Sequence, residues 1–305
     1  MLSGTRQKLR HGVRVVAPLS LSAILLAACG ASSSSSAPSV HLGGHSALLT
    51  AYRTTQKERS FAISTVENIT TIGGSQQSRT SGYVYQTGSN PISIDAELTN
   101  NGFVPSSHQN VSSTERVIGN TVYLGIPSNE LGLTTLSGAR WIQSTLVGPS
   151  TALTNPLGQA GSTNPTSVLA AIARRLKTQI TTVGAATVNG HATTEYSANI
   201  SGANFLHTLE STVHAQALAK ALSALNFDSP LMIKFWIGTN GLLRQELVHL
   251  DISVIQKGSA AIPVTISMQV DLTRYGATFP AVKAPTSGII SQQAFFAALE
   301  ASYSH

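Results

Sequence analysis

The sequence predicts an α+β domain in which amphipathic helices lie on the apolar face of a twisted antiparallel sheet. Three observations support this fold class. Long stretches alternate between apolar and polar residues, pairs of turn-forming residues separate these stretches, and four other segments carry apolar residues at helical spacing. A period of two is typical of antiparallel strands that bury one side, and one-sided helices pack against such a face.

The clearest strand covers residues 262–272. Its even positions are all apolar, from Ile262 to Leu272, whereas most of its odd positions are polar. Residues 248–254 and 92–98 alternate in the same way, which indicates strands with one buried and one wetted side. Further candidate strands bring the expected meander to nine or more: residues 61–71, 82–86, 121–126, 140–146, 193–200 and 231–237.

Turn-forming dipeptides lie between these segments. Asparagine and glycine tolerate the backbone angles of tight hairpins, so such pairs mark the points where one strand returns to the next. The pairs are Gly73-Gly74, Asn101-Gly102, Gly119-Asn120, Asn189-Gly190 and Asn240-Gly241.

Helices are expected at four places. Asn164-Pro165 starts one, because asparagine caps a helix and proline suits its first position. Apolar residues recur every three or four positions after it and in three other segments. The predicted helices begin at Asn164 and cover residues 46–56, 203–225 and 291–303.

The N-terminus has the anatomy of a bacterial lipoprotein signal. A basic segment without acidic residues precedes a short apolar run, which ends in Leu26-Ala27-Ala28-Cys29. This ending matches a lipobox, so we expect cleavage after Ala28 and attachment of acyl chains to the Cys29 sulfur, whose reactive form is the thiolate. The run is too short and too interrupted to span a bilayer of about 30 Å. The sequence therefore predicts a protein anchored by acylated Cys29 to the extracytoplasmic face of the cell membrane.

The region after Cys29 divides into a tether and one domain. Residues 29–44 are rich in serine, glycine and alanine, a composition typical of a flexible linker. We thus expect a signal peptide over residues 1–28, a tether over 29–44 and a single domain over 45–305. Cys29 is the only cysteine in the chain, which excludes disulfides, a thiol nucleophile and cysteine-ligated metals in that domain.

Composition limits the classes of partner. Only 10% of the residues are charged and 42% are hydrophobic, which fits a folded domain with a large buried or ligand-facing surface. Four basic residues and no acidic residue precede the cut, so cleavage lowers the formal net charge from +6 to +2. Most of the excess positive charge therefore lies in the signal peptide. Because the rest of the chain carries little net charge, we expect no nucleic-acid partner.

The familiar enzyme motifs are missing from the sequence. It contains no Gly-x-Ser-x-Gly, His-Glu-x-x-His, Ser-x-x-Lys, phosphate-binding loop or Gly-x-Gly-x-x-Gly. His207, Glu210 and His214 could lie on one side of a helix and ligate zinc. A polar flank beside an apolar stripe explains them better than a zinc site does, so we expect no metal, no cofactor and no enzyme activity.

Several short segments resemble actinobacterial lipoproteins of the LppX/LprG group. Residues 115–124 (ERVIGNTVYL) and 139–143 (ARWIQ) are similar to a recurring pair in that group, and residues 236–244 (WIGTNGLLR) and 271–276 (DLTRYG) to its C-terminal half. These proteins share the half-barrel of the LolA/LolB lipoprotein carriers. The resemblance implies a strongly curved antiparallel sheet, helices on its concave face and an apolar cavity for acyl chains. It also implies a lipid or glycolipid ligand in transit across the envelope and an envelope transporter as a possible partner.

Two of the alternating strands supply candidate ligand-lining residues. Each buried methylene of an acyl chain contributes about 0.8 kcal/mol, so an apolar groove needs no polar motif. Alternation also fits an ordinary closed core, in which case the protein is a sensor or scaffold that acts through protein contacts. In either case we expect a monomer. The candidates, which would share one face, are Val248, Leu250, Ile252, Val264, Ile266, Met268 and Val270.

Overall fold

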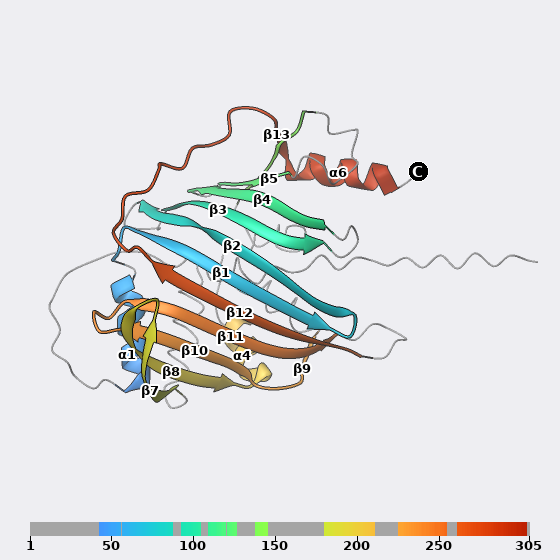
Figure 1. The fold of residues 1–305 in the computed structure, drawn as a ribbon. Coiled ribbons are helices and arrows are strands. Elements are labelled where there is room, and N and C mark those ends of the chain that lie inside the picture. The colour runs from blue at the N-terminus through green and yellow to red at the C-terminus, as the bar shows by residue number, and fades with distance from the viewer. Residues whose placement is uncertain are drawn as a thin grey trace, which may run out of the picture.

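The computed structural model describes residues 43–55, 57–87, 93–104, 109–119, 121–126, 138–145, 180–210, 225–254 and 261–303 of the 305-residue chain. They form one sheet of thirteen strands, whose order is β13-β6-β5-β4-β3-β2-β1-β12-β11-β10-β8-β7, with β9 paired to β11 off this path (Figure 1). The strands are β1 (Ser60–Thr71), β2 (Gly74–Thr87), β3 (Ser93–Val104), β4 (Gln109–Ile118), β5 (Thr121–Gly125), β6 (Trp141–Thr145), β7 (Ile180–Val188), β8 (His191–Ile200), β9 (Leu225–Phe227), β10 (Leu231–Gly238), β11 (Leu243–Val254), β12 (Ile262–Thr273) and β13 (Ile289–Ser291).

Two runs of antiparallel neighbours make up this sheet. The strands β1 to β6 form one run and the strands from β7 to β12 form the other, and the two meet where β1 pairs with β12. Their junction is long, since the register continues from Ala62 opposite Thr273 to Thr71 opposite Val264. The outermost strands, β7 and β13, do not pair with each other, so the sheet stays open.

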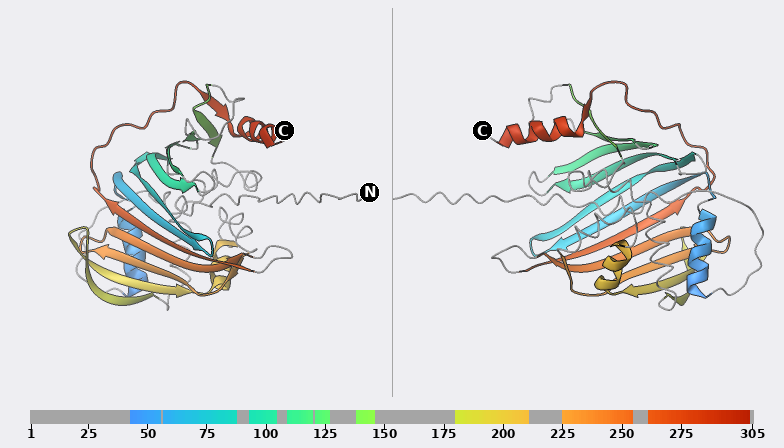
Figure 2. Two further views of the ribbon diagram at one scale, coloured as in Figure 1. Left: turned by 45° about the vertical axis from the view of Figure 1, so that its right-hand side comes forward. Right: turned by 180° about the vertical axis from the view of Figure 1, so that it is seen from behind.

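Three helices accompany the sheet: α1 (Gly44–Thr55), α4 (Gly202–Glu210) and α6 (Gln292–Tyr303). Serine hydroxyls cap two of them, because Ser201 Oγ accepts the Asn204 N–H at 3.3 Å and Ser291 Oγ accepts the Ala294 N–H at 3.1 Å. The sheet curves strongly, and α1 and α4 lie on its concave side, as the views in Figure 2 show. The predicted fold class is therefore confirmed. Within the described residues, no helix has the length and apolar character needed to cross a membrane.

The start of α4 depends on close approach to β9. A Cβ atom at Gly202 would lie only 2.3 Å from Cγ of Phe227, so a larger residue would push the helix away. Phe205, one turn further along α4, meets the same ring edge to face, with 6.2 Å between centroids. These contacts fix α4 beside β9 at one end of the concave side.

An extended segment, residues 274–288, connects β12 to the far edge of the sheet. Its Phe279 stacks on Tyr83 with 5.2 Å between ring centroids, and its backbone exchanges hydrogen bonds with the Tyr85 hydroxyl. The Gly288 carbonyl then accepts the backbone N–H groups of Arg140 and Trp141 at 2.7 and 2.9 Å. This segment delivers β13 parallel to β6, which makes that pair the exception in a sheet of otherwise antiparallel pairs.

Some sequence-based element predictions were wrong. Asn101-Gly102 forms no turn, because both residues lie inside β3 and pair with Arg79 and Ser78 of β2. The long helix predicted to end at Leu225 cannot do so, because Leu225 begins β9. Four strands were also missed: β4, β7, β9 and β13.

Other predictions concern residues outside the described part of the chain. These are the signal peptide, the tether, the helix that starts at Asn164 and residues 211–224 of the long helix. They remain predictions.

Candidate functional site

The concave side of the sheet, called the inner face below, gathers the predicted ligand-lining residues. Leu250 lies opposite Ile266, Val248 opposite Met268, and Ile252 opposite Val264, while Val270 follows Met268 on the same side of β12. Because paired residues share a face, these side chains form one continuous surface. Further apolar residues extend this surface across β10 and β8: Leu231, Ile233, Phe235, Tyr196, Ala198 and Ile200.

This apolar half of the inner face is buried. Phe235 is 1% exposed, Met268 and Val270 are each 2% exposed, and Val264 is partly buried against the same cluster. Such a surface stabilises the fold, since each Å² of apolar area removed from water contributes about 25 cal/mol. That these residues line a ligand remains a prediction.

Helix α1 packs on this apolar half. Leu48 and Ala51 are each 1% exposed, and Tyr52 meets Phe235 edge to face with 6.4 Å between ring centroids. The end of α1 is held as well, because Thr55 Oγ1 accepts the Leu243 N–H at 3.0 Å. The first described helix is therefore fixed to β10 and β11 by apolar and polar contacts.

Glu246 of β11 is a carboxyl group within the apolar half. It is 3% exposed, and the Tyr52 hydroxyl of α1 donates a hydrogen bond to its Oε1. Burial raises the pKa of Glu246 to about 7, although the bond from Tyr52 opposes this rise. The pKa of Tyr52 is raised well above its ordinary value. The main cause is burial of the hydroxyl, and the second is the negative charge of the Glu246 carboxylate. At neutral pH the folded protein thus holds Glu246 partly protonated.

The inner face changes character on β1 and β2, which form its polar half. Phe61 and Ile63 continue the apolar surface, but the next inward residues of β1 are Thr65 and Glu67, 1% and 3% exposed. Thr80 of β2, 5% exposed, lies opposite Thr65.

Two glutamates add carboxyl groups to this side of the sheet: Glu67 of β1, in the polar half, and Glu115 of β4, beyond it. On β2, Ser78 lies opposite Glu67 and donates to its Oε2 at 3.2 Å. On β4, burial raises the pKa of Glu115 to about 7. Neither this polar half nor Glu246 was predicted from the sequence. Extending the alternation of residues 61–71 past Ile63 would have placed Thr65 and Glu67 on the buried side.

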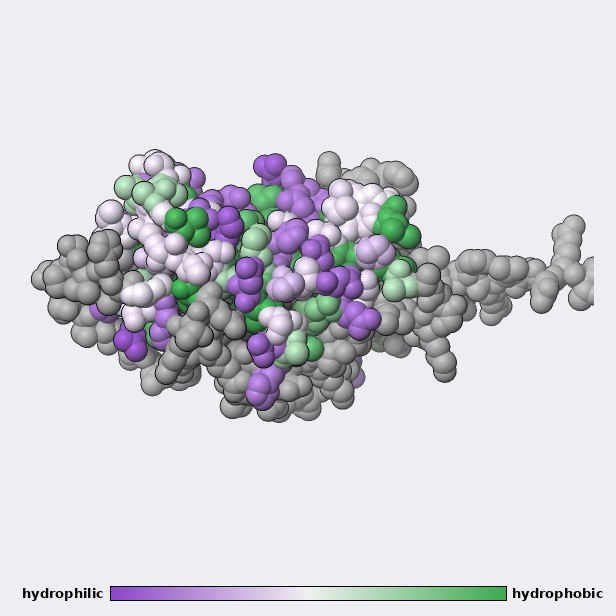
Figure 3. Space-filling model, turned by 90° about the horizontal axis from the view of Figure 1, so that it is seen from below, coloured by the Kyte–Doolittle hydropathy of each residue, from purple (hydrophilic) through white to green (hydrophobic). Residues whose placement is uncertain are grey.

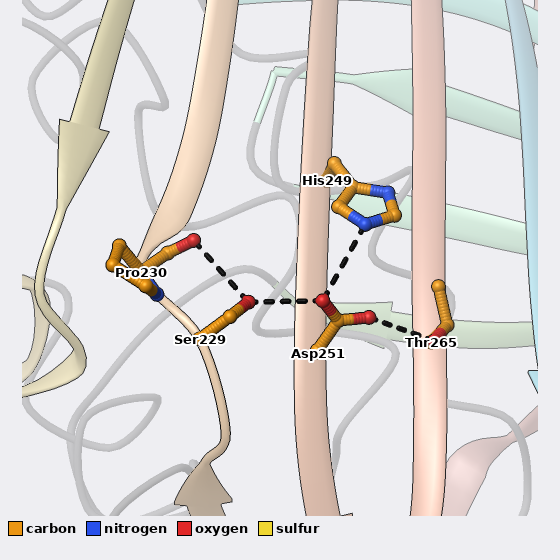
Figure 4. A network of polar contacts seen from close by, with 5 residues as sticks. All are labelled: Ser229, Pro230, His249, Asp251 and Thr265. Atoms are coloured by element: carbon orange, nitrogen blue, oxygen red, sulfur yellow. Dashed lines mark hydrogen bonds and ion pairs between the residues drawn. The ribbon is translucent and has the colours of Figure 1, made fainter.

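The outer face carries a polar network around Asp251 (Figure 4). Its Oδ1 accepts from Thr265 at 2.7 Å, and its Oδ2 accepts from Ser229 at 2.9 Å and lies 3.6 Å from His249 Nε2. The bonds from Thr265 and Ser229 lower the pKa of Asp251. In a catalytic triad the histidine lies between the serine and the carboxylate. Here Ser229 and His249 both contact the Asp251 carboxylate, so the network is no triad. The network therefore ties the β9–β10 connection to β11 and β12.

Seen from below, the described surface is mixed in character (Figure 3). Hydrophilic residues alternate there with scattered hydrophobic ones. The most exposed large hydrophobic residue described is Ile72, at 78%, in the turn between β1 and β2.

Neither of the other two sites considered from the sequence can be assessed geometrically. Cys29 and His214 lie outside the described residues, and His207 is exposed on α4. Among the described residues, no group of three or more histidine, aspartate or glutamate side chains could hold a metal ion. The prediction that His207, Glu210 and His214 bind no zinc stays untested.

Comparisons with known proteins give matches among solved structures. No protein-family model matches the sequence, and no curated protein matches it. The structure is similar to that of the Mycobacterium tuberculosis lipoprotein LppX, with 12% identity and a TM-score of 0.41 over 78% of this chain and 97% of that one. It is similar to LprF from Mycobacterium bovis, with 16% identity and a TM-score of 0.39 over 79% and 96%.

A third similar structure is a putative outer membrane lipoprotein-sorting protein domain from Vibrio parahaemolyticus. Its identity is 7% and its TM-score 0.29, over 78% of this chain and 94% of that one. The predicted resemblance to the LppX/LprG group is confirmed, because LppX and LprF are among the matches. Identities and TM-scores this low assign no ligand or role to the chain.

Proposed function

We propose that this protein is an envelope lipoprotein that holds a lipid against the inner face of its sheet and carries it between membranes. In this proposal, acylated Cys29 anchors the chain at the extracytoplasmic face of the cell membrane. A tether over residues 29–44 then links the anchor to one domain over residues 45–305. At about 3.4 Å per extended residue, this tether lets the domain reach about 50 Å from its anchor.

The observation that carries the proposal is the continuous apolar half of the inner face. It extends over four neighbouring strands, β8, β10, β11 and β12, of a sheet that stays open at both edges. An open, curved sheet can admit an acyl chain beside such a surface, at a gain of about 0.8 kcal/mol per buried methylene.

A second function is favoured by the burial of the same residues. The chain's own atoms already leave Leu250, Met268 and Val270 at 2% exposure. A closed core of this kind would suit an envelope sensor or scaffold that acts through protein contacts. The two functions differ in whether the inner face can open to a lipid.

Lipid analysis of the full-length protein separates them. We would purify it from its native membrane and quantify co-purified lipids by mass spectrometry, for the wild type and for Met268→Trp. The matched control is Ser267→Trp, because Ser267 is the neighbouring residue of β12 on the outer face. The lipid-carrier proposal expects lipid in the wild type and the control, and its loss in a folded Met268→Trp protein.

The scaffold function predicts a different result. In a closed core, the larger side chain at position 268 overpacks and costs about 1–3 kcal/mol or more. A wild type without lipid, together with a strongly destabilised Met268→Trp protein, would contradict the carrier proposal.

The anchor needs a separate experiment. Cys29→Ala should leave the protein exported but uncut by the lipoprotein peptidase and unlabelled by a fatty-acid probe. Normal acyl labelling of this variant would rule out attachment through Cys29.

A further inference from the structure

The hydroxyl of Thr65 is an exception within the buried inner face. Its Oγ1 finds no hydrogen-bond partner in the described part of the structure, although the residue is only 1% exposed. Leaving a buried hydroxyl unsatisfied costs free energy, so most folded proteins avoid it. A ligand that supplies the missing hydrogen bond would remove this cost.

The neighbours of Thr65 form a compact polar patch. Thr65 and Glu67 are consecutive inward residues of β1, and they lie opposite Thr80 and Ser78 of β2. Spacings of about 7 Å along a strand and about 5 Å between strands give the patch the size of a glycerol unit or one sugar ring. On the other side of β1, Thr65 and Glu67 lie opposite Val270 and Met268, so the patch borders the apolar half.

The patch favours a neutral group that both donates and accepts hydrogen bonds. Thr65, Ser78 and Thr80 carry hydroxyls, which act in either direction, and Glu67 adds carboxylate acceptors. Ser78 already donates to Glu67 at 3.2 Å, so the patch contains an ordered polar contact next to the unsatisfied hydroxyl. Hydroxyl groups of a ligand match this set better than an anion, which the glutamate would repel.

We propose that Thr65, Glu67, Ser78 and Thr80 form a subsite for the hydroxyl-bearing headgroup of an amphiphile whose apolar chain lies along Val270 and Met268. This inference rests on the proposed lipid-binding function and specifies the chemistry of the ligand. Glycerol and sugar headgroups share that chemistry.

The test uses two probes that differ only in their hydroxyl groups. These are 1-monooleoylglycerol and its 2,3-di-O-methyl ether, which share the oleoyl chain and the glycerol backbone; the ether carries a methyl group on each of the two free oxygens. Full-length acylated protein in detergent is equilibrated with equal amounts of both and repurified, and the bound ratio is measured by mass spectrometry. Division by the ratio in protein-free micelles corrects for partitioning.

The wild type should enrich monooleoylglycerol over the ether about five-fold, because one satisfied hydrogen bond contributes about 0.5–1.5 kcal/mol. Thr65→Val, which keeps the shape and removes the hydroxyl, should bring the ratio close to one without weakening ether binding. Ser78→Ala, at a partly buried position, should lower the ratio as well. The matched control is Thr70→Val, an identical change at an exposed position of the same strand, and it should keep the enrichment.

The outcomes separate this inference from the proposed function. Equal binding of both probes by the wild type would overturn the headgroup subsite while lipid binding stands. Full enrichment in folded Thr65→Val would overturn it also. Binding of neither probe would contradict lipid binding itself and, with it, the subsite.

Discussion

The two halves of the inner face differ although they belong to one sheet. Across β8, β10, β11 and β12 the inward residues are almost all apolar, and α1 packs on them. On β1 and β2 the inward residues change to threonine, serine and glutamate within one strand, between Ile63 and Thr65. Burial of apolar side chains explains the first half by stability alone. It does not explain the second, because burying polar groups costs free energy. The apolar half thus holds the fold together, whereas the polar half is the part that the proposed headgroup subsite would explain.

The largest effect is expected in the apolar half. Phe235→Ala should lower the free energy of unfolding by about 3–5 kcal/mol, because it leaves a cavity at a 1% exposed position against Tyr52. The measurement is denaturant unfolding followed by circular dichroism. The control is Phe279→Ala in the extended outer segment, where the ring is only partly buried and the cost should be smaller. Equal losses in the two variants would remove the special role of the apolar half.

Glu246, the one glutamate in the apolar half, should make stability depend on pH. Its pKa rises from about 4.5 in the unfolded chain to about 7 in the folded protein. The folded state therefore keeps its proton to higher pH. Its contribution to stability is complete below pH about 4.5, falls as the pH rises, and is lost above about 7, at a cost of about 3 kcal/mol.

Glu246→Gln removes this titration and keeps an oxygen to accept the Tyr52 hydrogen bond. The variant should match the wild type near pH 4.5 and be more stable at pH 8, by up to about 3 kcal/mol, in urea unfolding at both values. Some pH dependence should persist, because the pKa of Glu115 is raised to about 7 as well. Parallel pH profiles for wild type and variant would show that Glu246 keeps an ordinary pKa.

The strands that sequence predicts well are those whose alternation is uninterrupted. In β12 all six even positions are apolar, and both β12 and the helix α1 were expected within two residues of their observed ends. The strand β7 was missed because Gly184, with φ of +153°, and a register shift after Thr182 break its pattern. The turn predicted at Asn101-Gly102 was wrong for another reason. Pairing of β3 with β2 along ten residues outweighs the local preference of these two residues for a turn.

The residues of the candidate site also differ in how well the sequence predicts them. The apolar residues from Val248 to Val270 could be predicted, because alternation identifies a buried face directly. Thr65 and Glu67 were missed because threonine and glutamate suggest exposure, although the alternation that buries Phe61 and Ile63 continues through both. The contact between Tyr52 and Glu246 joins residues 194 positions apart, which no local pattern reveals.

A moderate effect is expected at the end of α1. Thr55→Val removes the hydroxyl that accepts the Leu243 N–H, at a position 3% exposed. An unsatisfied buried N–H costs about 1–3 kcal/mol, so the variant should lose that much stability and α1 should exchange its amide hydrogens faster. Hydrogen exchange by mass spectrometry follows α1 directly. Unchanged protection of α1 would show that its apolar contacts alone hold it.

The smallest effect is expected for two buried threonines, Thr193 and Thr65, which differ in the hydrogen bonding of their hydroxyls. Thr193 of β8, 5% exposed, donates its hydroxyl to the Ala186 carbonyl at 3.1 Å, whereas Thr65 has no such partner among the described residues. Thr193→Val should therefore cost about 1 kcal/mol in urea unfolding, while Thr65→Val should cost nothing or raise stability by a few tenths of a kcal/mol, about as expected when an unsatisfied group is removed. A residue whose loss leaves the ligand-free protein unharmed, yet removes discrimination between the two oleoyl probes, contributes to binding and not to folding. If Thr65→Val instead destabilises the protein as much as Thr193→Val, its hydroxyl has a structural partner, and the difference between the two halves would lose its functional explanation.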